Sequence, residues 1–309
     1  MRPKLIISCV IFLALATGER AVLFGAALFR ARESLKVHRA APVVSIPSPA
    51  SFRDVPGRGL LIRIWVNSTG PFSFAIDTGA GATILSERVA AQAGVTLSSG
   101  RTMSVAGLSG ARSSAHQVRI QSLAIGDRDN LLPPGGEVMV TSGLPRDLDG
   151  ILDPTEALAP FGYAIDIPRH ELSVFDPHET PLRMSHQPDE GTVVSWLRLG
   201  RERRPFVQLD SGERALIDTG SGLGLAIRES GPPSQESDAR VRDIGGGNIS
   251  ARRVAARTVS IGSLTLRRIP TDVISGAEAD APVLLGLSAL RPFRLRFDPL
   301  HRLIEIAPS

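Results

Sequence analysis

The tripeptide Asp-Thr-Gly occurs twice in this chain of 309 residues. Asp77-Thr78-Gly79 lies within SFAIDTGAGATILS, and Asp218-Thr219-Gly220 lies within RALIDTGSGLGLAI, 141 residues later. Both tripeptides follow an apolar run that ends in Ile, and both have a further glycine two residues later. A single Asp-Thr-Gly is most often a β-turn with a solvated aspartate. Because the second copy keeps the same context, we interpret the pair as a duplicated functional loop.

Two such aspartates have a specific chemical use. If the two halves of the chain pack about a pseudo-twofold axis, the two bends meet at the axis and bring both carboxylates together. Carboxylates a few ångströms apart cannot both ionise freely, so they share a proton; one acts as general base on a water and the other as general acid toward a carbonyl oxygen. We therefore predict Asp77 and Asp218 as catalytic residues, with supporting positions in the two loops at Thr78, Gly79, Thr219, Gly220 and Ser221.

The two loops differ at the residue that follows each tripeptide. Ser221 could hydrogen-bond Asp218, whereas Ala80 offers no such group to Asp77. This difference predicts unequal pKa values for the two aspartates.

Each half of the chain leads into its loop through the same order of predicted elements. A strand, a polar turn and further strand sequence precede each Asp-Thr-Gly, at residues 60–66 and 72–76 in the first half and at 193–199, 206–209 and 215–217 in the second. Each half also closes alike, at residues 161–175 and 293–306. Helical signals are limited to residues 86–93, 155–159 and 287–290. The sequence therefore predicts a mainly β protein with an internal duplication.

Composition suggests where the folded units begin and end. Residues 1–30 predict a signal peptide or membrane anchor, and residues 31–56, rich in Pro, Ser and Ala, predict a linker. We expect the first lobe at residues 57–178 and the second at 192–309. Residues 179–191 carry Pro, His and acidic residues without periodicity, so we expect them to link the lobes.

The amino-terminal segment has the features of an export signal. Arg2 and Lys4 precede an apolar run over residues 5–16, which ends in the small-x-small pattern Ala-Leu-Ala. A second apolar stretch at residues 21–29 keeps an uncleaved anchor, and with it membrane association, as an alternative. We therefore expect an exported protein, periplasmic or secreted, which is either free or anchored by this segment.

The composition gives little support to other kinds of site. With 35 basic and 31 acidic residues the net charge is only +4, and no arginine stripe with interleaved aromatics predicts nucleic-acid binding. The six histidines lack metal-ligand spacing, and residues 220–224 lack the spacing of a dinucleotide loop. The single cysteine, Cys9, lies in the export segment, and no Gly-x-Ser-x-Gly is present. We expect no metal and no organic cofactor.

The two loops resemble the active-site loops of aspartic proteases of the pepsin and retropepsin clan. The resemblance covers most of the chain after about residue 57, and it implies two pseudo-symmetric aspartic-protease-like β-barrel lobes, one catalytic Asp from each, and a cleft crossed by a peptide substrate. In this family two apolar residues and a glycine pack against each catalytic loop. Leu284-Leu285-Gly286 matches that element, but the first half reads Ile151-Leu152-Asp153. The departure puts the packing of the first lobe in question.

The resemblance also implies flaps over the cleft. Gly107-Leu108-Ser109-Gly110 and Gly245-Gly246-Gly247 lie where mobile flaps are expected, so Gly107, Gly110, Gly245 and Gly246 are candidate flap residues; simple hairpin turns are the alternative. The flap tyrosine of pepsin-like enzymes is absent, since the single tyrosine, Tyr163, belongs to the late part of the first lobe.

These observations predict an aspartic endopeptidase that hydrolyses protein or peptide substrates with one water activated between two carboxylates. Because one polypeptide supplies both aspartates, the site does not require a homodimer. An exported peptide-binding or scaffold protein that keeps the fold without useful catalysis is the alternative, motivated by Asp153 and the missing flap tyrosine. A chain whose halves each dimerise with another copy is a further alternative.

Overall fold

The structure is a computed structural model that describes residues 45–97, 101–134, 136–198, 203–228 and 239–309. The export segment predicted at residues 1–30 lies outside these ranges. Within them, no helix has the length and apolar character needed to span a membrane.

Strands dominate the described residues, as expected of a mainly β protein, and they form two curled sheets. The larger sheet has 14 strands, most of them from the first half of the chain: β1 (Ala50–Val55), β2 (Gly59–Val66), β3 (Thr69–Ile76), β4 (Ile84–Ser86), β5 (Arg101–Ala106), β6 (Arg112–Arg119), β7 (Leu123–Ile125), β8 (Glu137–Thr141), β9 (Gly150–Leu152), β10 (Gly162–Asp166), β11 (Glu171–Phe175), β12 (Thr192–Ser195), β20 (Phe293–Asp298) and β21 (Leu303–Pro308). The smaller sheet has seven: β13 (Phe206–Gln208), β14 (Arg214–Asp218), β15 (Leu225–Arg228), β16 (Ala239–Arg242), β17 (Asn248–Ile261), β18 (Leu264–Ser275) and β19 (Val283–Gly286).

The helices are short and lie close to where the sequence predicts them. They are α1 (Glu87–Gln92), α2 (Pro154–Ala157) and α3 (Leu287–Leu290). Ser86 caps α1 by accepting the Val89 N–H, and Asp153 caps α2.

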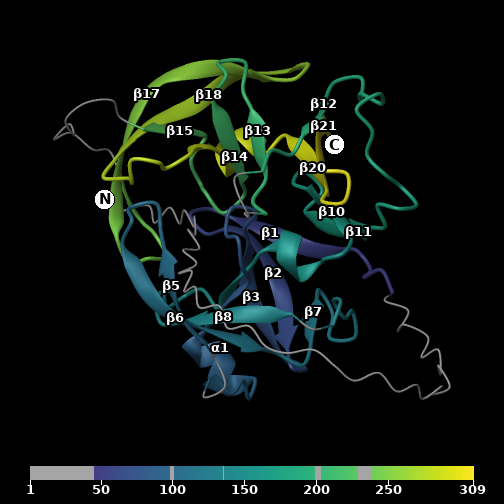
Figure 1. Cartoon of the computed structure of the whole chain (residues 1–309), viewed down its shortest axis with the longest axis vertical. Coiled ribbons are helices and arrows are strands. Elements are labelled where there is room, and N and C mark those ends of the chain that lie inside the picture. Colours follow the sequence, from purple (N-terminus) through teal and green to yellow (C-terminus); the bar gives the residue numbers. More distant parts are fainter. Residues whose placement is uncertain (1–44, 98–100, 135, 199–202, 229–238) are drawn as a thin grey trace, which may run out of the picture.

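The two lobes have the same topology and occupy the lower and upper parts of the molecule (Figure 1). In the first lobe β3 runs parallel to β9, and β4 runs parallel to β8. In the second lobe β14 runs parallel to β19, and β15 runs parallel to β18. The internal duplication inferred from the sequence is therefore a duplication of the fold.

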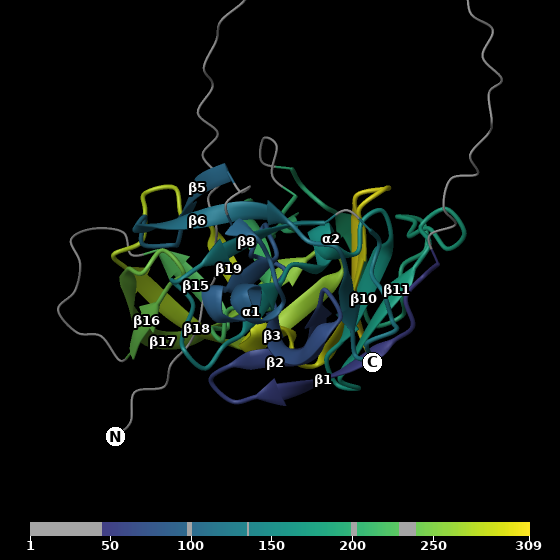
Figure 2. The ribbon, with the colours of Figure 1, turned by 90° about the horizontal axis from the view of Figure 1, so that it is seen from below.

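The lobes are joined by a shared part of the larger sheet, in which β10 pairs antiparallel with β20 (Figure 2). Ala164 lies opposite Arg296, and these two residues hold equivalent positions in the repeated closing segments. The pseudo-twofold axis therefore passes between them. Tyr163 stacks on Phe297 at 4.7 Å between ring centroids, with Trp196 edge-on to Phe297. The single tyrosine is thus a core residue of the junction.

The segment expected to be a linker at residues 31–56 contains β1. This strand pairs with β2 on one side and β11 on the other, and Ala50 and Phe52 are buried while Ser51 and Arg53 face solvent. The fold therefore begins upstream of Gly57. The alternation of buried and exposed side chains decides the conformation here, despite the prolines on either side.

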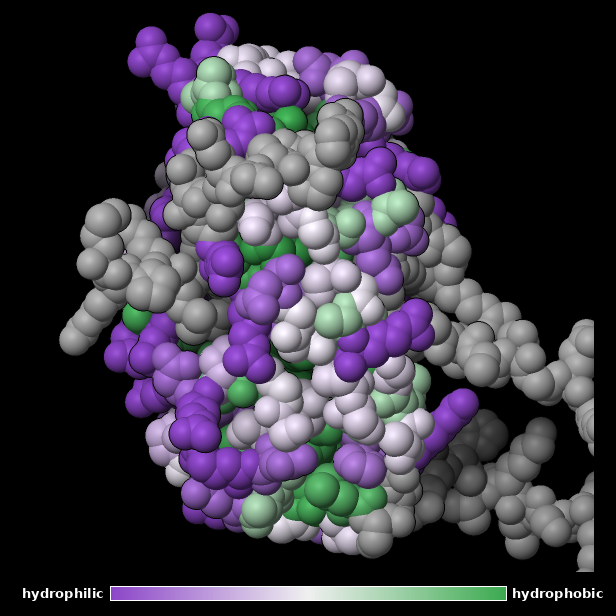
Figure 3. All heavy atoms as spheres, turned by 90° about the vertical axis from the view of Figure 1, so that its left-hand side faces the viewer, coloured by the Kyte–Doolittle hydropathy of each residue, from purple (hydrophilic) through white to green (hydrophobic). Residues whose placement is uncertain are grey.

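One large apolar cluster runs through both lobes and includes side chains from either side of the axis, such as Ile76 and Ile217 at the ends of β3 and β14. On the face seen in Figure 3, hydrophobic residues reach the surface only in small separate groups among hydrophilic ones.

Candidate active site

Each aspartate of the duplicated tripeptide lies where a buried strand ends. Asp77 follows β3 and donates its backbone N–H to the carbonyl of Leu152 at 2.9 Å. Asp218 is the last residue of β14 and pairs with Gly286 of β19. Because a parallel neighbour fixes each strand end, the bends that follow have defined positions. The side chains of Asp77 and Asp218 are 1% and 0% exposed.

The two threonines brace the loops against each other across the pseudo-twofold axis. The Thr78 hydroxyl donates to the carbonyl of Ile217 at 2.6 Å, and the Thr219 hydroxyl donates to the carbonyl of Ile76 at 3.0 Å. Each hydroxyl also accepts the backbone N–H of the other threonine, at 3.1 and 3.2 Å. This reciprocal brace satisfies buried backbone groups of both lobes and holds the two bends together.

The glycines let the two carboxylates meet. Each accepts the N–H of its own glycine, from Gly79 to Asp77 at 2.8 Å and from Gly220 to Asp218 at 3.0 Å. A methyl group added at Gly79 would lie 2.8 Å from Cγ of Asp218, and one added at Gly220 would overlap Cγ of Asp77. Each carboxylate therefore packs against the glycine of the opposite loop. Within the described residues, the buried Oδ2 of Asp218 accepts no hydrogen bond.

The two carboxyl groups have different surroundings, as the sequence predicts. Burial, followed by the neighbouring Asp218, raises the pKa of Asp77 well above its usual range. Burial also raises the pKa of Asp218, to about 6, against the lowering effects of the hydrogen bond with Asp77 and of the N–H groups of Ser221 and Gly220. The pair titrates as a unit, with its first ionisation favoured at Asp218.

The source of this difference is not the one expected from the sequence. Ser221 acts on Asp218 through its backbone N–H, which donates to Oδ1 at 3.0 Å. Its hydroxyl instead accepts the N–H of Leu223 at 3.4 Å. Residue type at position 221 therefore matters to the shape of the loop, while the charge of Asp218 is stabilised by the backbone.

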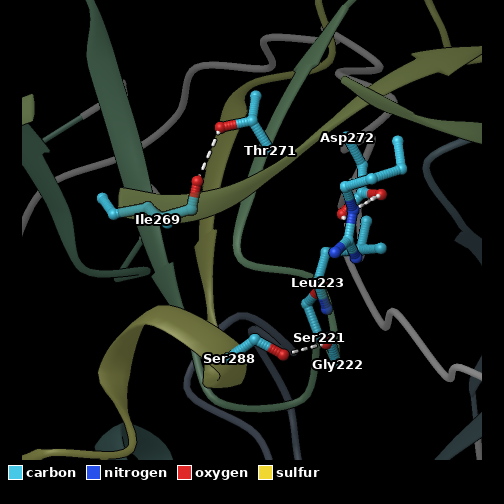
Figure 4. A network of polar contacts seen from close by, with 8 residues as sticks. Ser221, Gly222, Leu223, Ile269, Thr271, Asp272 and Ser288 are labelled. Carbon is cyan, nitrogen blue, oxygen red and sulfur yellow. Dashed lines mark hydrogen bonds and ion pairs between the residues drawn. The ribbon is translucent and has the colours of Figure 1, made fainter. Parts of the chain in front are cut away.

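The loop that carries Asp218 is held in place by contacts with α3 and with the end of β19. The Ser288 hydroxyl donates to the carbonyl of Gly222 at 2.7 Å (Figure 4), and the N–H of Leu287 donates to the carbonyl of Ser221 at 2.7 Å. A side chain at Gly286 would meet the carbonyl of Ser221 at 2.8 Å. The Leu-Leu-Gly element therefore packs against the loop as the resemblance implies.

Comparison with known families bears on the first lobe. Residues 62–152, from β2 to the end of β9, match the aspartyl protease family. The first lobe is therefore similar to the aspartyl protease family over these residues. The matched segment contains Asp77 and the first candidate flap, and the second lobe repeats its topology. No curated protein matches the chain.

In the first lobe, a buried acid stands where the second lobe has Gly286. Asp153 is 2% exposed, and its carboxylate accepts the N–H of Thr155 at 2.9 Å. Burial, followed by the charge of Glu156, raises the pKa of Asp153 to about 7. Thr155 in turn shares a hydrogen bond of 2.8 Å with the hydroxyl of Tyr163. The sequence marks Asp153 as a departure from the family pattern, but only the fold shows that it is buried.

The candidate flap residues lie at the tips of two hairpins that reach across to the opposite lobe. Gly107 and Gly110 belong to the tip between β5 and β6, and Gly245 and Gly246 to the tip between β16 and β17. Leu108 of the first tip is buried in an apolar cluster whose other buried members, among the described residues, belong to the second lobe. Ile244 of the second tip is buried in a cluster of the first lobe.

These clusters also contain residues of the catalytic loops. Leu108 shares its cluster with Leu223, and Ile244 shares its cluster with Ala80. Each flap tip therefore belongs to the same apolar cluster as one of the two loops that carry the aspartates. The sequence gives no signal for Ile244 and its neighbour Asp243, because their contacts are made with the other lobe.

Among the described residues, no group of three or more His, Cys, Asp and Glu side chains could hold a metal ion.

Proposed function

We propose that the protein is an aspartic endopeptidase in which Asp77 and Asp218 together activate one water for attack on a peptide bond. The observation that carries the proposal is the packing of each carboxylate against the glycine of the opposite loop, with the two loops held together by the threonine brace. Such a pair carries one proton between its two ionisations.

The unequal pKa values suggest a role for each aspartate. Asp218, which ionises first, acts as general base and takes a proton from the water as the water attacks the carbonyl carbon. Asp77, which holds its proton to higher pH, donates to the carbonyl oxygen as the tetrahedral intermediate forms. Collapse of the intermediate returns a proton to the leaving amine, and no covalent intermediate forms. No step needs a cofactor.

The substrate we propose is an extended segment of a protein or peptide, bound between the lobes and under the flaps. One polypeptide supplies both halves of the site, so the reaction does not require a homodimer. We further propose that the protein is exported, on the basis of the cationic and apolar segment at residues 1–16. Fractionation of cells that express the full chain, with and without this segment, tests that part.

The decisive experiment replaces each aspartate by asparagine. Asp77→Asn and Asp218→Asn keep the size of the side chain, so both variants should fold, while turnover of an unfolded protein substrate should fall by at least about 1,000-fold. Urea unfolding of each variant shows whether the fold is kept. Full activity in either variant would refute the shared-dyad mechanism.

A peptide-binding scaffold without useful catalysis is the second candidate, and it is favoured by the buried Asp153 in place of a glycine. The two functions separate when the purified protein is incubated with an unfolded protein from pH 3 to 9, with and without a statine inhibitor. Cleavage that the inhibitor blocks supports the peptidase. Saturable binding of peptide without cleavage at any pH supports the scaffold.

A further inference from the structure

The two flap tips are built alike but differ at one position. In the first, the N–H of Gly107 donates to the carbonyl of Ala111 at 3.2 Å; in the second, the N–H of Asp243 donates to the carbonyl of Gly247 at 3.1 Å. Asp243 therefore stands where the first flap has Gly107. One flap has a carboxylate at this position, and the other has no side chain.

The carboxylate of Asp243 connects the two tips. Its Oδ2 accepts the backbone N–H of Ser109, on the opposite flap, at 2.7 Å, and its Oδ1 accepts the N–H of Gly247, on its own flap, at 3.1 Å. The side chain is only 3% exposed. A hydrogen bond from an amide to a charged acceptor is stronger than one between neutral groups. One buried carboxylate thus ties both flaps together.

The glycines around Asp243 make room for this contact. A methyl group added at Gly107 would overlap the carboxylate of Asp243, and one added at Gly247 would overlap the hydroxyl of Ser109. A side chain at Gly245 would overlap the carbonyl of Ala111. An aspartate at both positions would also place two like charges together. The sequence asymmetry between the flaps is therefore what a single connecting carboxylate requires.

Each tip is further held by the lobe that it enters. The carbonyl of Leu108 accepts the N–H of Glu278 at 2.9 Å, and the carbonyl of Ile244 accepts the Ser113 hydroxyl at 3.2 Å. Asp77 and Asp218 are almost fully buried, so substrate needs a local opening of the structure to reach them, and the joined tips are the segments that we expect to move. Parting them breaks the bond between Asp243 and Ser109 and withdraws two apolar side chains from their clusters.

We propose that Asp243 is a latch: a positioning residue that holds the two flaps closed and sets how often the site opens to substrate. This inference rests on the proposed peptidase function for its consequence in turnover, but the latch itself is a property of the free protein. Loosening the latch increases the rate at which ligand enters. It also lets the flaps close less firmly over bound ligand, so ligand leaves faster.

The test compares Asp243→Asn with Asp272→Asn. Asparagine keeps the size of residue 243 but removes its charge and leaves one oxygen to accept two N–H groups. Asp272 (Figure 4) is a matched control, because it is similarly buried in the same lobe and pairs with Arg253 on β17, outside the flap tip. Amide exchange is measured for peptides that cover residues 105–113 and 243–250. Asp243→Asn should speed exchange in both peptides by at least about tenfold, and Asp272→Asn in neither.

Inhibitor kinetics supply the second measurement. The association rate of a statine inhibitor should rise severalfold in Asp243→Asn, and its dissociation rate should rise as well. Gly107→Ala tests the same contact from the other flap, because its methyl group displaces the carboxylate of Asp243 while residue 243 itself stays unsubstituted. Its effect on exchange should match that of Asp243→Asn, and the double variant should add little to either single variant.

If amide exchange at both flap tips is unchanged in Asp243→Asn and in Gly107→Ala, the latch is overturned, whatever the activity of these variants. Faster exchange in only the flap that carries the substitution would overturn it too, because a latch acts on both flaps. The exchange measurements can be repeated in the Asp77→Asn background, where turnover is absent. Failure of the peptidase proposal, seen as an inert wild-type protein, is therefore distinguishable from failure of the latch.

Discussion

Asp153 in the first lobe and Gly286 in the second occupy the same position beside the two Asp-Thr-Gly loops. Leu152 pairs with Ile76 just before Asp77, and Gly286 pairs with Asp218 itself. The first lobe therefore places a third buried acid next to the two at the centre of the site. Its charge, when present, raises the pKa of Asp77 further. The pseudo-symmetry of the fold is thus broken electrostatically close to Asp77 and Asp218.

The first prediction concerns stability and pH. Because the pKa of Asp153 is about 7 in the folded protein against 3.8 ordinarily, the folded state binds more protons than the unfolded state between these values. The contribution of Asp153 to the free energy of unfolding therefore falls as the pH rises from about 4 to about 7, by up to about 4 kcal/mol. Asp153→Asn removes this contribution and should still cap α2, because asparagine is a good N-cap residue.

Urea unfolding at pH 4.5 and pH 7.5 checks this prediction. The stability of Asp153→Asn relative to wild type should increase between the two pH values. Asp147→Asn, at an exposed ion pair with Arg58, is the control and should show no comparable change. A constant difference between Asp153→Asn and wild type would mean that Asp153 is not a high-pKa group.

The second prediction is the pH profile of cleavage. The proposed mechanism needs a dyad that carries one proton, and the pKa of Asp218 is about 6. Below that pH the base becomes protonated, so kcat/KM should fall about tenfold per pH unit toward pH 3. Above it activity should hold until Asp77 loses its proton. A profile with its maximum at pH 3 to 4 would contradict the raised pKa of Asp218.

Local patterns explain why so much of the site could be predicted from the sequence. Asp77 and Asp218 stand out because a tripeptide, its preceding strand and a later glycine recur together, and topology then brings the two copies face to face. The role of Asp243 could not be predicted, since its partner Ser109 is 134 residues away and in the other lobe. Residues 50–55 were missed because prolines on both sides hid the alternation of a short strand. Burial, which gives Asp153 its raised pKa, is a property of the assembled lobe.

The third prediction concerns the threonine brace. Thr219→Val keeps the shape of the side chain but leaves the N–H of Thr78 without its acceptor and the carbonyl of Ile76 without the hydroxyl. Buried groups without partners are costly, so we expect a loss of about 2–4 kcal/mol in unfolding free energy. Thr271→Val is the matched control, because its buried hydroxyl donates to the nearby carbonyl of Ile269 (Figure 4) and, among the described residues, joins no other loop. It should cost about 1 kcal/mol.

Activity separates these two threonine variants further. Thr219→Val should lower kcat by at least about tenfold under conditions where the protein is still folded, because the relative position of the two carboxylates changes. Thr271→Val should leave kcat within about twofold of wild type. Equal effects of both substitutions on kcat would argue that the brace contributes stability alone.

The last prediction uses the glycines that separate the carboxylates. Gly220→Ala would place a methyl group into Cγ of Asp77, whereas Gly79→Ala would place one 2.8 Å from Cγ of Asp218. Neither glycine has a positive φ, so the backbone accepts alanine and the effect arises from the contact. We expect kcat to fall by about 100-fold or more in Gly220→Ala, and by less in Gly79→Ala. Gly136→Ala, where an added methyl group meets no atom within 4 Å, should retain wild-type activity. A fully active Gly220→Ala would show that the two carboxylates need not pack against the opposite loop for the reaction to proceed.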